Sequence, residues 1–327
     1  MLILTAHDIR ETISMREAID AVREGFIALS ANRTDVPIRS SVSTPDGIML
    51  NMPAYIEGAA VSVVKTVTVY PGNPARGLPT IIGSVLVLDA TTGIPLALLD
   101  GTSLTALRTG AASGLATDLL ARPETHKLGV IGTGVQARTQ IEAVCAVRAI
   151  QEIRLYSLDS ASASKLASEL RDQYEADVVI ANNAHEALAD ADVLVAATNS
   201  KTPVIHWSDI SSGAHINGIG SFTPEMQEIA ADVVINARIV VDHRESVWEE
   251  AGDLIIPRDQ GLIDENSIHA EIGEIAAGSA SGRADDQEVT FFKSVGNAVQ
   301  DATVAARIIM TAMKSGTGTQ VDFHDFA

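Results

Sequence analysis

The chain has 327 residues, 46% hydrophobic but only 4% aromatic, and its 42 acidic and 23 basic side chains give a net charge of −19. This length suits two domains, and the acidic excess disfavours nucleic acid as a partner, because phosphate contacts need clustered lysine and arginine. No apolar run reaches the roughly 20 residues of a membrane helix and the N-terminus lacks signal-peptide features, so we expect no membrane contact and a cytoplasmic location.

The first hundred residues predict a mostly antiparallel sheet preceded by a helix. Residues 7–32 carry apolar side chains at helical spacing, and residues 36–71 contain three β-rich segments separated by turn residues. Two further strands, at 81–89 and 94–100, are joined by Ala-Thr-Thr-Gly, which is a hairpin signal. Residues 101–121 then predict a helix rich in small side chains.

Strands and helices alternate from residue 127 to about 243, which predicts a parallel sheet with helices on both faces. The tail adds a helical piece near 268–278, a strand at 289–295 and a last helix from about 297 to 313. We expect strands of the parallel sheet at 127–132, 152–157, 177–181, 192–197, 215–220 and 239–243.

These patterns predict an α/β protein with a Rossmann-type doubly wound parallel sheet and a second, mostly antiparallel α+β domain. We place the α+β domain at residues 1–118, completed by the last helix within 300–327. The dinucleotide-binding domain then spans residues 119–299.

A Gly-x-Gly-x-x-Ala pattern, formed by Gly132, Gly134 and Ala137, lies between an apolar strand and a helix. The first glycine permits a tight turn, the second lets the backbone approach a pyrophosphate, and the alanine lets helix and strand pack closely. The helix dipole favours the anion. The motif therefore predicts a nicotinamide or flavin nucleotide, with Val135 and Gln136 at the start of the helix also in contact with it.

Ser157 stands where an NAD site carries the acid that binds the adenosine ribose, and Asp159 follows two residues later. A serine tolerates the 2′-phosphate of NADP, but no arginine sits beside it to bind that phosphate. Asp159 turned inward would repel the phosphate and favour NAD. Because Asp159 can equally cap the helix predicted at 160–173, both NAD and NADP stay open as cofactors.

Further cofactor contacts are predicted at the ends of two later strands. Thr198 follows the strand at 192–197, Gly220 ends the strand at 215–220, and Ser221 follows it. Ligands bind at the carboxyl ends of strands in doubly wound sheets. The alternative is that these are ordinary loop residues.

Three cationic side chains interrupt otherwise apolar segments, namely Arg39, Lys65 and Arg108. Each alone fits a solvated face, but together two guanidinium groups and an ammonium suit a small carboxylate substrate. A lysine near two arginines should have a lowered pKa, so Lys65 could exchange protons near neutral pH. This interpretation requires the three side chains to meet in space.

Other chemistries find little support in the sequence. The eight histidines show no metal-ligand spacing and no Gly-x-Ser-x-Gly elbow is present, so we expect neither a metal site nor a hydrolase. Cys145, the single cysteine, lies in the helix after the glycine motif and is interpreted as buried filler rather than a nucleophile.

Taken in order, these segments resemble the ornithine cyclodeaminase/μ-crystallin family over nearly the whole chain. Arg39 and Lys65 stand before two of the matching segments. The segments are NMPAY (51–55), PGNPARGLPT (71–80), LLDGTSLTALRTGAASG (98–114), GVIGTGVQAR (129–138), AATNSKTPV (196–204), GIGSFTPEMQEI (218–229) and FFKSVGNAVQD (291–301).

The resemblance implies a reaction at a carbon–nitrogen bond next to a carboxylate, with a nicotinamide cofactor. It also implies a homodimer whose N-terminal domain supplies the substrate pocket and the subunit interface. By this resemblance Arg39 and Arg108 bind the substrate carboxylate, with Arg108 also close to the cofactor, and Lys65 polarises or protonates the substrate. Thr80 matches a threonine that contacts the cofactor.

The sequence departs from the family at Phe222, where the cyclodeaminases and alanine dehydrogenases carry an aspartate that handles the attacking amine or water. Phenylalanine accepts no proton, whereas reducing an existing imine needs only a hydride, a bound carboxylate and one proton donor. We therefore predict NAD(P)H-dependent reduction of a small 2-imino acid, with a cyclic ketimine such as 1-pyrroline-2-carboxylate favoured.

Three alternatives stay open. The second choice is an amino-acid dehydrogenase that forms alanine or aspartate, and the third is ornithine cyclodeaminase; either is feasible if Glu225, Glu228 or a water replaces the missing base. A nucleotide-binding protein with little catalysis is opposed by the intact set of Arg39, Lys65 and Arg108.

Overall fold

A computed structural model describes residues 1–323. The chain divides into two compact units: unit 1 contains Met1–Arg108 and the chain from Asn297 onward, and unit 2 contains Thr109–Gly296. The first division falls within helix α3 (Gly101–Leu120), ahead of the expected boundary at 118–119, and the second lies three residues before the expected one at 299–300. The last four residues of the segment 300–327 lie outside the described residues.

Unit 1 is built on a mixed, mostly antiparallel sheet, which has eight strands within residues 1–323. The strand order is β16-β1-β7-β6-β5-β4-β2, with β3 paired to β4, and β1 is parallel to β7. The strands are β1 (Leu2–Leu4), β2 (Thr34–Asp35), β3 (Ser40–Thr44), β4 (Gly47–Ile56), β5 (Val61–Val69), β6 (Ile81–Asp89), β7 (Pro95–Asp100) and β16 (Thr319–Gln320).

The single helix expected at 7–32 is two helices, α1 (Ala6–Thr12) and α2 (Met15–Ser30). The chain is extended at Ile13, and Ser14 then begins a new helix through a capping box with Glu17. The sequence prediction overlooked this restart because apolar side chains continue at helical spacing on both sides of it.

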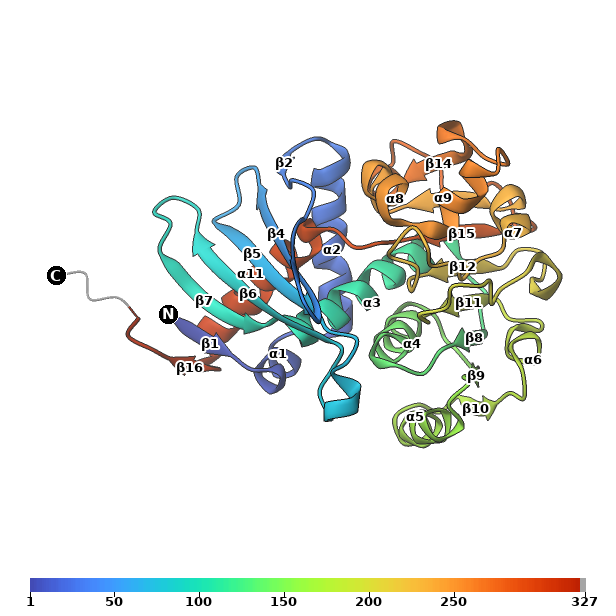
Figure 1. The fold of residues 1–327 in the computed structure, drawn as a ribbon, viewed down its shortest axis with the longest axis horizontal. Helices are drawn as coiled ribbons and strands as arrows, with labels where there is room; N and C mark the ends of the chain where they lie inside the picture. The colour runs from blue at the N-terminus through green and yellow to red at the C-terminus, as the bar shows by residue number, and fades with distance from the viewer. Residues whose placement is uncertain (324–327) are drawn as a thin grey trace. The chain divides into compact units, whose positions relative to one another are not determined.

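Helix α11 (Ala298–Ser315) returns to unit 1 and lies against α2 and strands β4 and β5. Figure 1 shows it running behind the strands of the sheet. In β5 the side chains of Val63, Lys65 and Val67 are buried and alternate with half-exposed ones, as expected for a strand covered on one face. Lys65 therefore points into the layer that α11 covers.

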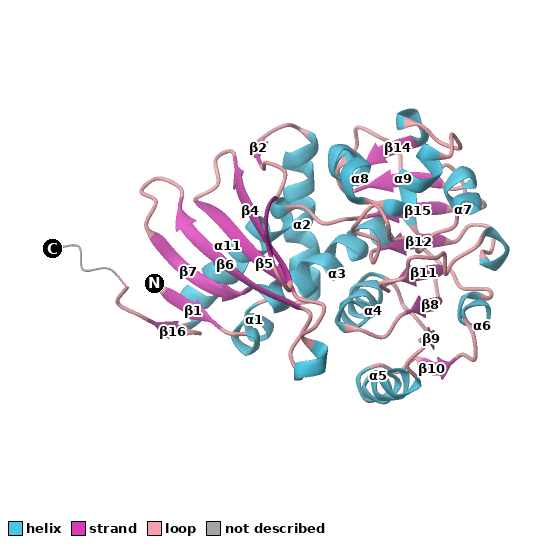
Figure 2. Ribbon diagram, in the orientation of Figure 1, coloured by secondary structure: helices cyan, strands magenta, loops and turns pink. Residues whose placement is uncertain are grey.

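Unit 2 contains a parallel sheet whose eight described strands run in the order β10-β9-β8-β11-β12-β15-β13-β14. The order reverses between β8 and β11, which is the ligand-binding switch point of doubly wound sheets. Figure 2 shows α4 and α5 on one side of this sheet and α6 and α7 on the other. The strands are β8 (Lys127–Ile131), β9 (Glu152–Tyr156), β10 (Asp177–Ile180), β11 (Val193–Ala196), β12 (His215–Gly218), β13 (Arg238–Val241), β14 (Ile268–Glu271) and β15 (Thr290–Lys293).

The predicted α/β fold class is confirmed, with one local error in unit 2. The helical piece expected near 268–278 begins as strand β14, which pairs with β13, and only α10 (Ile272–Ala276) is helical. None of the helices in residues 1–323 is both long and apolar enough to cross a bilayer. The remaining helices of unit 2 are α4 (Val135–Val147), α5 (Ser160–Gln173), α6 (Ala184–Leu188), α7 (Ala231–Asn236), α8 (Arg244–Glu250) and α9 (Gly252–Asp259).

Candidate active site

Two of the three predicted cations meet on one buried carboxylate of unit 1, that of Asp301. Lys65 Nζ lies 2.7 Å from Asp301 Oδ2, and Arg108 Nε lies 3.3 Å from Asp301 Oδ1. The exposed fractions are 1% for Lys65, 5% for Arg108 and 0% for Asp301. Buried charges persist only when they are paired, so Asp301 is what allows both cations to be placed here.

Gln300 fixes the arginine from the neighbouring position of α11. Arg108 Nη1 donates to Gln300 Oε1 at 2.8 Å, and Gln300 Nε2 donates to the Arg108 carbonyl at 3.3 Å. Gln300 Oε1 also accepts from the backbone N–H of Asn297 at 2.8 Å, which closes the capping box that begins the helix. The start of α11 is thus hydrogen-bonded to Arg108 of α3.

Arg39 is half-buried in the loop just before β3, close enough for its charge to act on Lys65. Burial above all, together with the charges of Arg108 and Arg39 and against the opposing effect of Asp301, lowers the pKa of Lys65 to about 7. Near neutral pH this side chain can therefore both hold and release a proton. The charge of Arg39 thus acts on the pair formed by Lys65 and Arg108.

The glycine motif has the geometry that a pyrophosphate requires. Gly132 has a φ of +102°, and a Cβ there would collide with the carbonyl oxygen of Ala197, so only glycine fits. Gly134 is the N-cap of α4 and offers no side chain to the free N–H groups of the first turn, while the space around its Cα is open. A bare helix N-terminus facing open space fits an anionic phosphate.

Val135 and Gln136 form the exposed start of α4. Val135 is 63% exposed, and Gln136 is half-buried, with its Oε1 left without a hydrogen-bond partner. Ala137 is fully buried against the strand layer, as the motif predicts.

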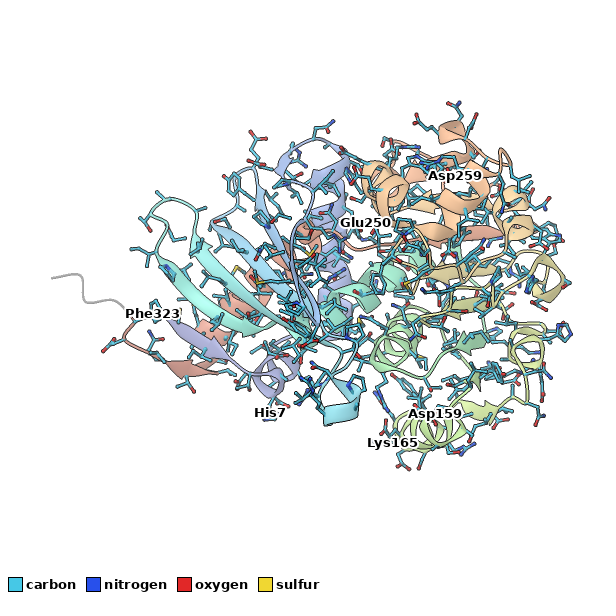
Figure 3. The ribbon with its side chains drawn as sticks, viewed as in Figure 1. His7, Asp159, Lys165, Glu250, Asp259 and Phe323 are labelled. Atoms are coloured by element: carbon cyan, nitrogen blue, oxygen red, sulfur yellow. The ribbon has the colours of Figure 1, made fainter. Side chains whose placement is uncertain are left out.

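Asp159 is the N-cap of α5 and lies at the surface of unit 2 (Figure 3). Its Oδ1 accepts from the backbone N–H groups of Ala161 at 3.0 Å and Ser162 at 3.1 Å. Ser157 Oγ in turn accepts from the N–H of Asp159 at 3.2 Å. The capping role therefore uses one carboxylate oxygen and leaves the negative charge exposed at the end of β9.

Thr198, Gly220 and Ser221 converge on a carboxylate that received no such role in the sequence analysis, that of Glu228. Its Oε1 accepts from Thr198 N at 2.5 Å and Thr198 Oγ1 at 2.7 Å. Its Oε2 accepts from Gly220 N at 2.5 Å and Ser221 N at 3.1 Å. Glu228 is fully buried and both of its oxygens are occupied by unit 2 itself, so it does not replace the base missing at Phe222.

The other predicted residues lie apart from these clusters. Thr80 is half-exposed in the loop before β6, where its carbonyl accepts from Tyr70 N at 2.8 Å. Phe222 is 39% exposed after β12. Burial raises the pKa of the Cys145 thiol to about 12, so it carries no thiolate near neutral pH. Within residues 1–323 no group of three metal-binding side chains is present.

The sequence model of the ornithine cyclodeaminase/mu-crystallin family matches residues 1–317. The chain belongs to this family. A Delta(1)-pyrroline-2-carboxylate reductase of Bacillus cereus is 41% identical over 326 residues, which cover 99% of this chain and 100% of that protein.

Two solved structures of the family are closely similar to this chain. The first is the Delta(1)-pyrroline-2-carboxylate reductase of Thermococcus litoralis in complex with NADH and L-proline, with a TM-score of 0.95 and 41% identity over 98% of this chain and 100% of that one. The second is an archaeal alanine dehydrogenase dimer with bound NAD, with a TM-score of 0.93 and 36% identity over 99% of each chain.

Asp301 and Gln300 are the residues that sequence reasoning missed. Both end the segment FFKSVGNAVQD, which contributed to the family resemblance, but no role was inferred for either. An acidic residue in the first turn of a helix is ordinarily explained by the helix dipole. Only the packing of α11 against β5 reveals that Asp301 faces Lys65.

Proposed function

We propose that this protein reduces the C=N bond of a small cyclic 2-imino acid, such as 1-pyrroline-2-carboxylate, with NADH or NADPH. The observation that carries the proposal is the buried arrangement of Lys65, Asp301 and Arg108, which combines a proton donor with a carboxylate-binding cation. The two pyrroline-2-carboxylate reductases, each 41% identical over essentially the whole chain, support the same reaction.

The substrate carboxylate binds to the guanidinium groups of Arg39 and Arg108, whose planar N–H donors suit its two oxygens. Lys65 donates a proton to the imine nitrogen, which makes the adjacent carbon a better hydride acceptor. Its pKa of about 7 keeps part of the side chain as ammonium at neutral pH, and the carboxylate of Asp301 stabilises that form. Phe222 supplies no base, and an imine that already exists needs none.

The nicotinamide cofactor supplies the hydride when bound. The amides around Gly132, Gly134, Val135 and Gln136 hold its pyrophosphate, and Ser157 and Asp159 face its adenosine ribose. Contacts nearer the nicotinamide come from the strand ends at Thr198, Gly220 and Ser221, with Thr80 and Arg108 as further contacts. The open space at Gly134 and the uncapped start of α4 support this assignment.

We also propose that the protein is a cytoplasmic homodimer that pairs through the outer face of the unit 1 sheet. Val64, Leu86 and Leu98 lie side by side in register on β5, β6 and β7, on the face opposite Lys65, and all three are half-exposed. A row of apolar side chains of this kind suits a second copy of the chain. The similar archaeal alanine dehydrogenase is a dimer, which supports a dimeric state.

The test is a comparison of NADH and NADPH oxidation with three substrate sets. The first is preformed 1-pyrroline-2-carboxylate, and the second is pyruvate or oxaloacetate with ammonia. The third is ornithine, for which the release of ammonia is measured as well. We expect rapid oxidation with the cyclic imine and formation of proline. Faster oxidation with a 2-oxo acid and ammonia would instead favour an amino-acid dehydrogenase. The 36% identity to the archaeal alanine dehydrogenase supports this alternative.

A further inference from the structure

The carboxyl edge of the unit 2 sheet is held by a buried charge cluster, defined here as Glu228, Asp253 and Lys293. Asp253, on α9, accepts from the backbone N–H groups of Glu228 at 2.7 Å and Ile229 at 3.0 Å through Oδ1. Lys293, at the end of β15, lies with Nζ 2.8 Å from Asp253 Oδ2. All three side chains have exposed fractions of 0%.

Glu228 sits at the point where this cluster meets the strand ends. Four donors of Thr198, Gly220 and Ser221 point at its two oxygens, so it joins the end of β11 to the end of β12. Gly220 has no room for a side chain, because a Cβ there would collide with the carbonyl of Thr198 and lie 2.5 Å from Glu228 Oε1. The two strand ends are therefore held in one arrangement by a single carboxylate.

We propose that Glu228 is a positioning residue for the cofactor: in its ionised form it holds Thr198, Gly220 and Ser221 in the conformation that binds the nicotinamide half of the dinucleotide. This inference rests on the proposed function, which assigns those three residues to the cofactor. Glu228 does not touch the substrate. It acts through the backbone N–H groups of Thr198, Gly220 and Ser221, which donate hydrogen bonds to it.

The ionised state is favoured because three of the four donors are backbone N–H groups, which cannot accept a hydrogen bond. A proton on Oε2 would face the N–H groups of Gly220 and Ser221, and at least one of these contacts would be lost. A proton on Oε1 could be accepted by the Thr198 hydroxyl, but the neutral carboxyl would then accept weaker hydrogen bonds than the carboxylate does. Burial above all, with the negative charge of Asp253, raises the pKa of Glu228 to about 7, against the opposing effects of Lys293 and the hydrogen bonds from Thr198. Protonation therefore competes with the positioning role near neutral pH.

The experiment measures the Kd of NADH by fluorescence titration from pH 6 to pH 8.5, without substrate. For the wild type we expect the Kd to rise as the pH falls through about 7, approaching tenfold per pH unit at most, since one proton is coupled to binding. Glu228→Gln should weaken binding at pH 8 by about tenfold, as for the loss of one or two charge-assisted hydrogen bonds. Its Kd should no longer vary with pH.

The matched control is Glu249→Gln, which makes the same change at an exposed position of α8 and should retain the wild-type profile. Asp253→Asn removes the charge that raises the Glu228 pKa, so it should move the midpoint of the Kd profile to lower pH. A merely structural role for Glu228 would lower the thermal stability of the free protein without removing the pH dependence.

The inference is overturned if the wild-type Kd is constant across this pH range, or if Glu228→Gln keeps the wild-type pH dependence. The first of these outcomes requires no variant, so the proposal stays testable even if Glu228→Gln does not fold. Absence of both NADH and NADPH binding at every pH would contradict the proposed function and this inference together, whereas pH-independent binding contradicts this inference alone.

Discussion

Lys65 Nζ and Asp301 Oδ2 lie 2.7 Å apart, and neither side chain is more than 1% exposed. Removing one partner of a buried pair typically costs about 3–5 kcal/mol, because the other charge is left uncompensated. Asp301 also contacts Arg108, so it stands between the proposed proton donor and the proposed carboxylate binder. The first two predictions test the proton donor and the effect of Asp301 on it.

Lys65→Ala should lower kcat for imine reduction at least ~100-fold, as expected for the loss of a general acid. Steady-state oxidation of NADH with 1-pyrroline-2-carboxylate measures this. The Kd of NADH should stay within about twofold of the wild type, because the motif at Gly132 is unchanged. Turnover close to the wild-type rate would reject Lys65 as the proton donor.

The rate of the wild type should fall as the pH rises above about 7, because deprotonation of Lys65 removes the acid. Asp301 raises the pKa of Lys65, so Asp301→Asn should move this decline to lower pH and reduce kcat at pH 7 by about tenfold per unit of displacement. Asp20→Asn, at an exposed site of α2, is the control. An unchanged pH profile in Asp301→Asn would show that Asp301 does not set the acidity of Lys65.

Phe222→Asp should raise the rate of ammonia-dependent NADH oxidation with pyruvate, because it restores an acid where the dehydrogenases of the family carry one. We expect a gain of about 10-fold or more, which is below the roughly 100- to 10,000-fold effect of a well-positioned general base. Phe222 is 39% exposed, so the change should leave the fold intact. Phe222→Leu is the matched control. An equal gain in that variant would mean that the smaller side chain, and not the carboxylate, causes the gain.

Asp159→Asn should lower the KM for NADPH relative to that for NADH by about tenfold, because it removes a negative charge beside the 2′-phosphate. Asparagine keeps an acceptor oxygen for the N–H groups of Ala161 and Ser162, so α5 should remain capped. The KM ratio of the two cofactors is the measurement. A ratio that does not change would place Asp159 outside the adenosine site.

Much of the fold follows from local patterns in the sequence. The strand predicted at 152–157 is β9 (Glu152–Tyr156), and the helix predicted at 160–173 is α5 (Ser160–Gln173). The position of β15 between β12 and β13 did not follow, because strand order depends on long-range pairing that periodicity does not encode. The short strand β1 was missed for the same reason, since it is stabilised by its neighbours β7 and β16.

The candidate site also contains residues that local sequence predicts and residues that it does not. The glycine motif is local in sequence, so its residues could be predicted one by one. The roles of Asp301 and Glu228 could not, since each is defined by partners on other elements: Lys65 on β5 for the first, and Thr198 after β11 for the second. The sequence around an acidic residue does not predict which cation or backbone amide the residue will contact in the folded protein.

Unit 1 is assembled from both ends of the chain, whereas unit 2 is one continuous segment. During synthesis Arg108 leaves the ribosome 192 residues before Gln300, and unit 2 is made in full between them. Domains generally fold as units while the chain is still being made, so unit 2 is able to fold before α11 exists. Until that helix arrives, Lys65 has no carboxylate partner, and the competence to reduce an imine is the last property that the nascent protein acquires.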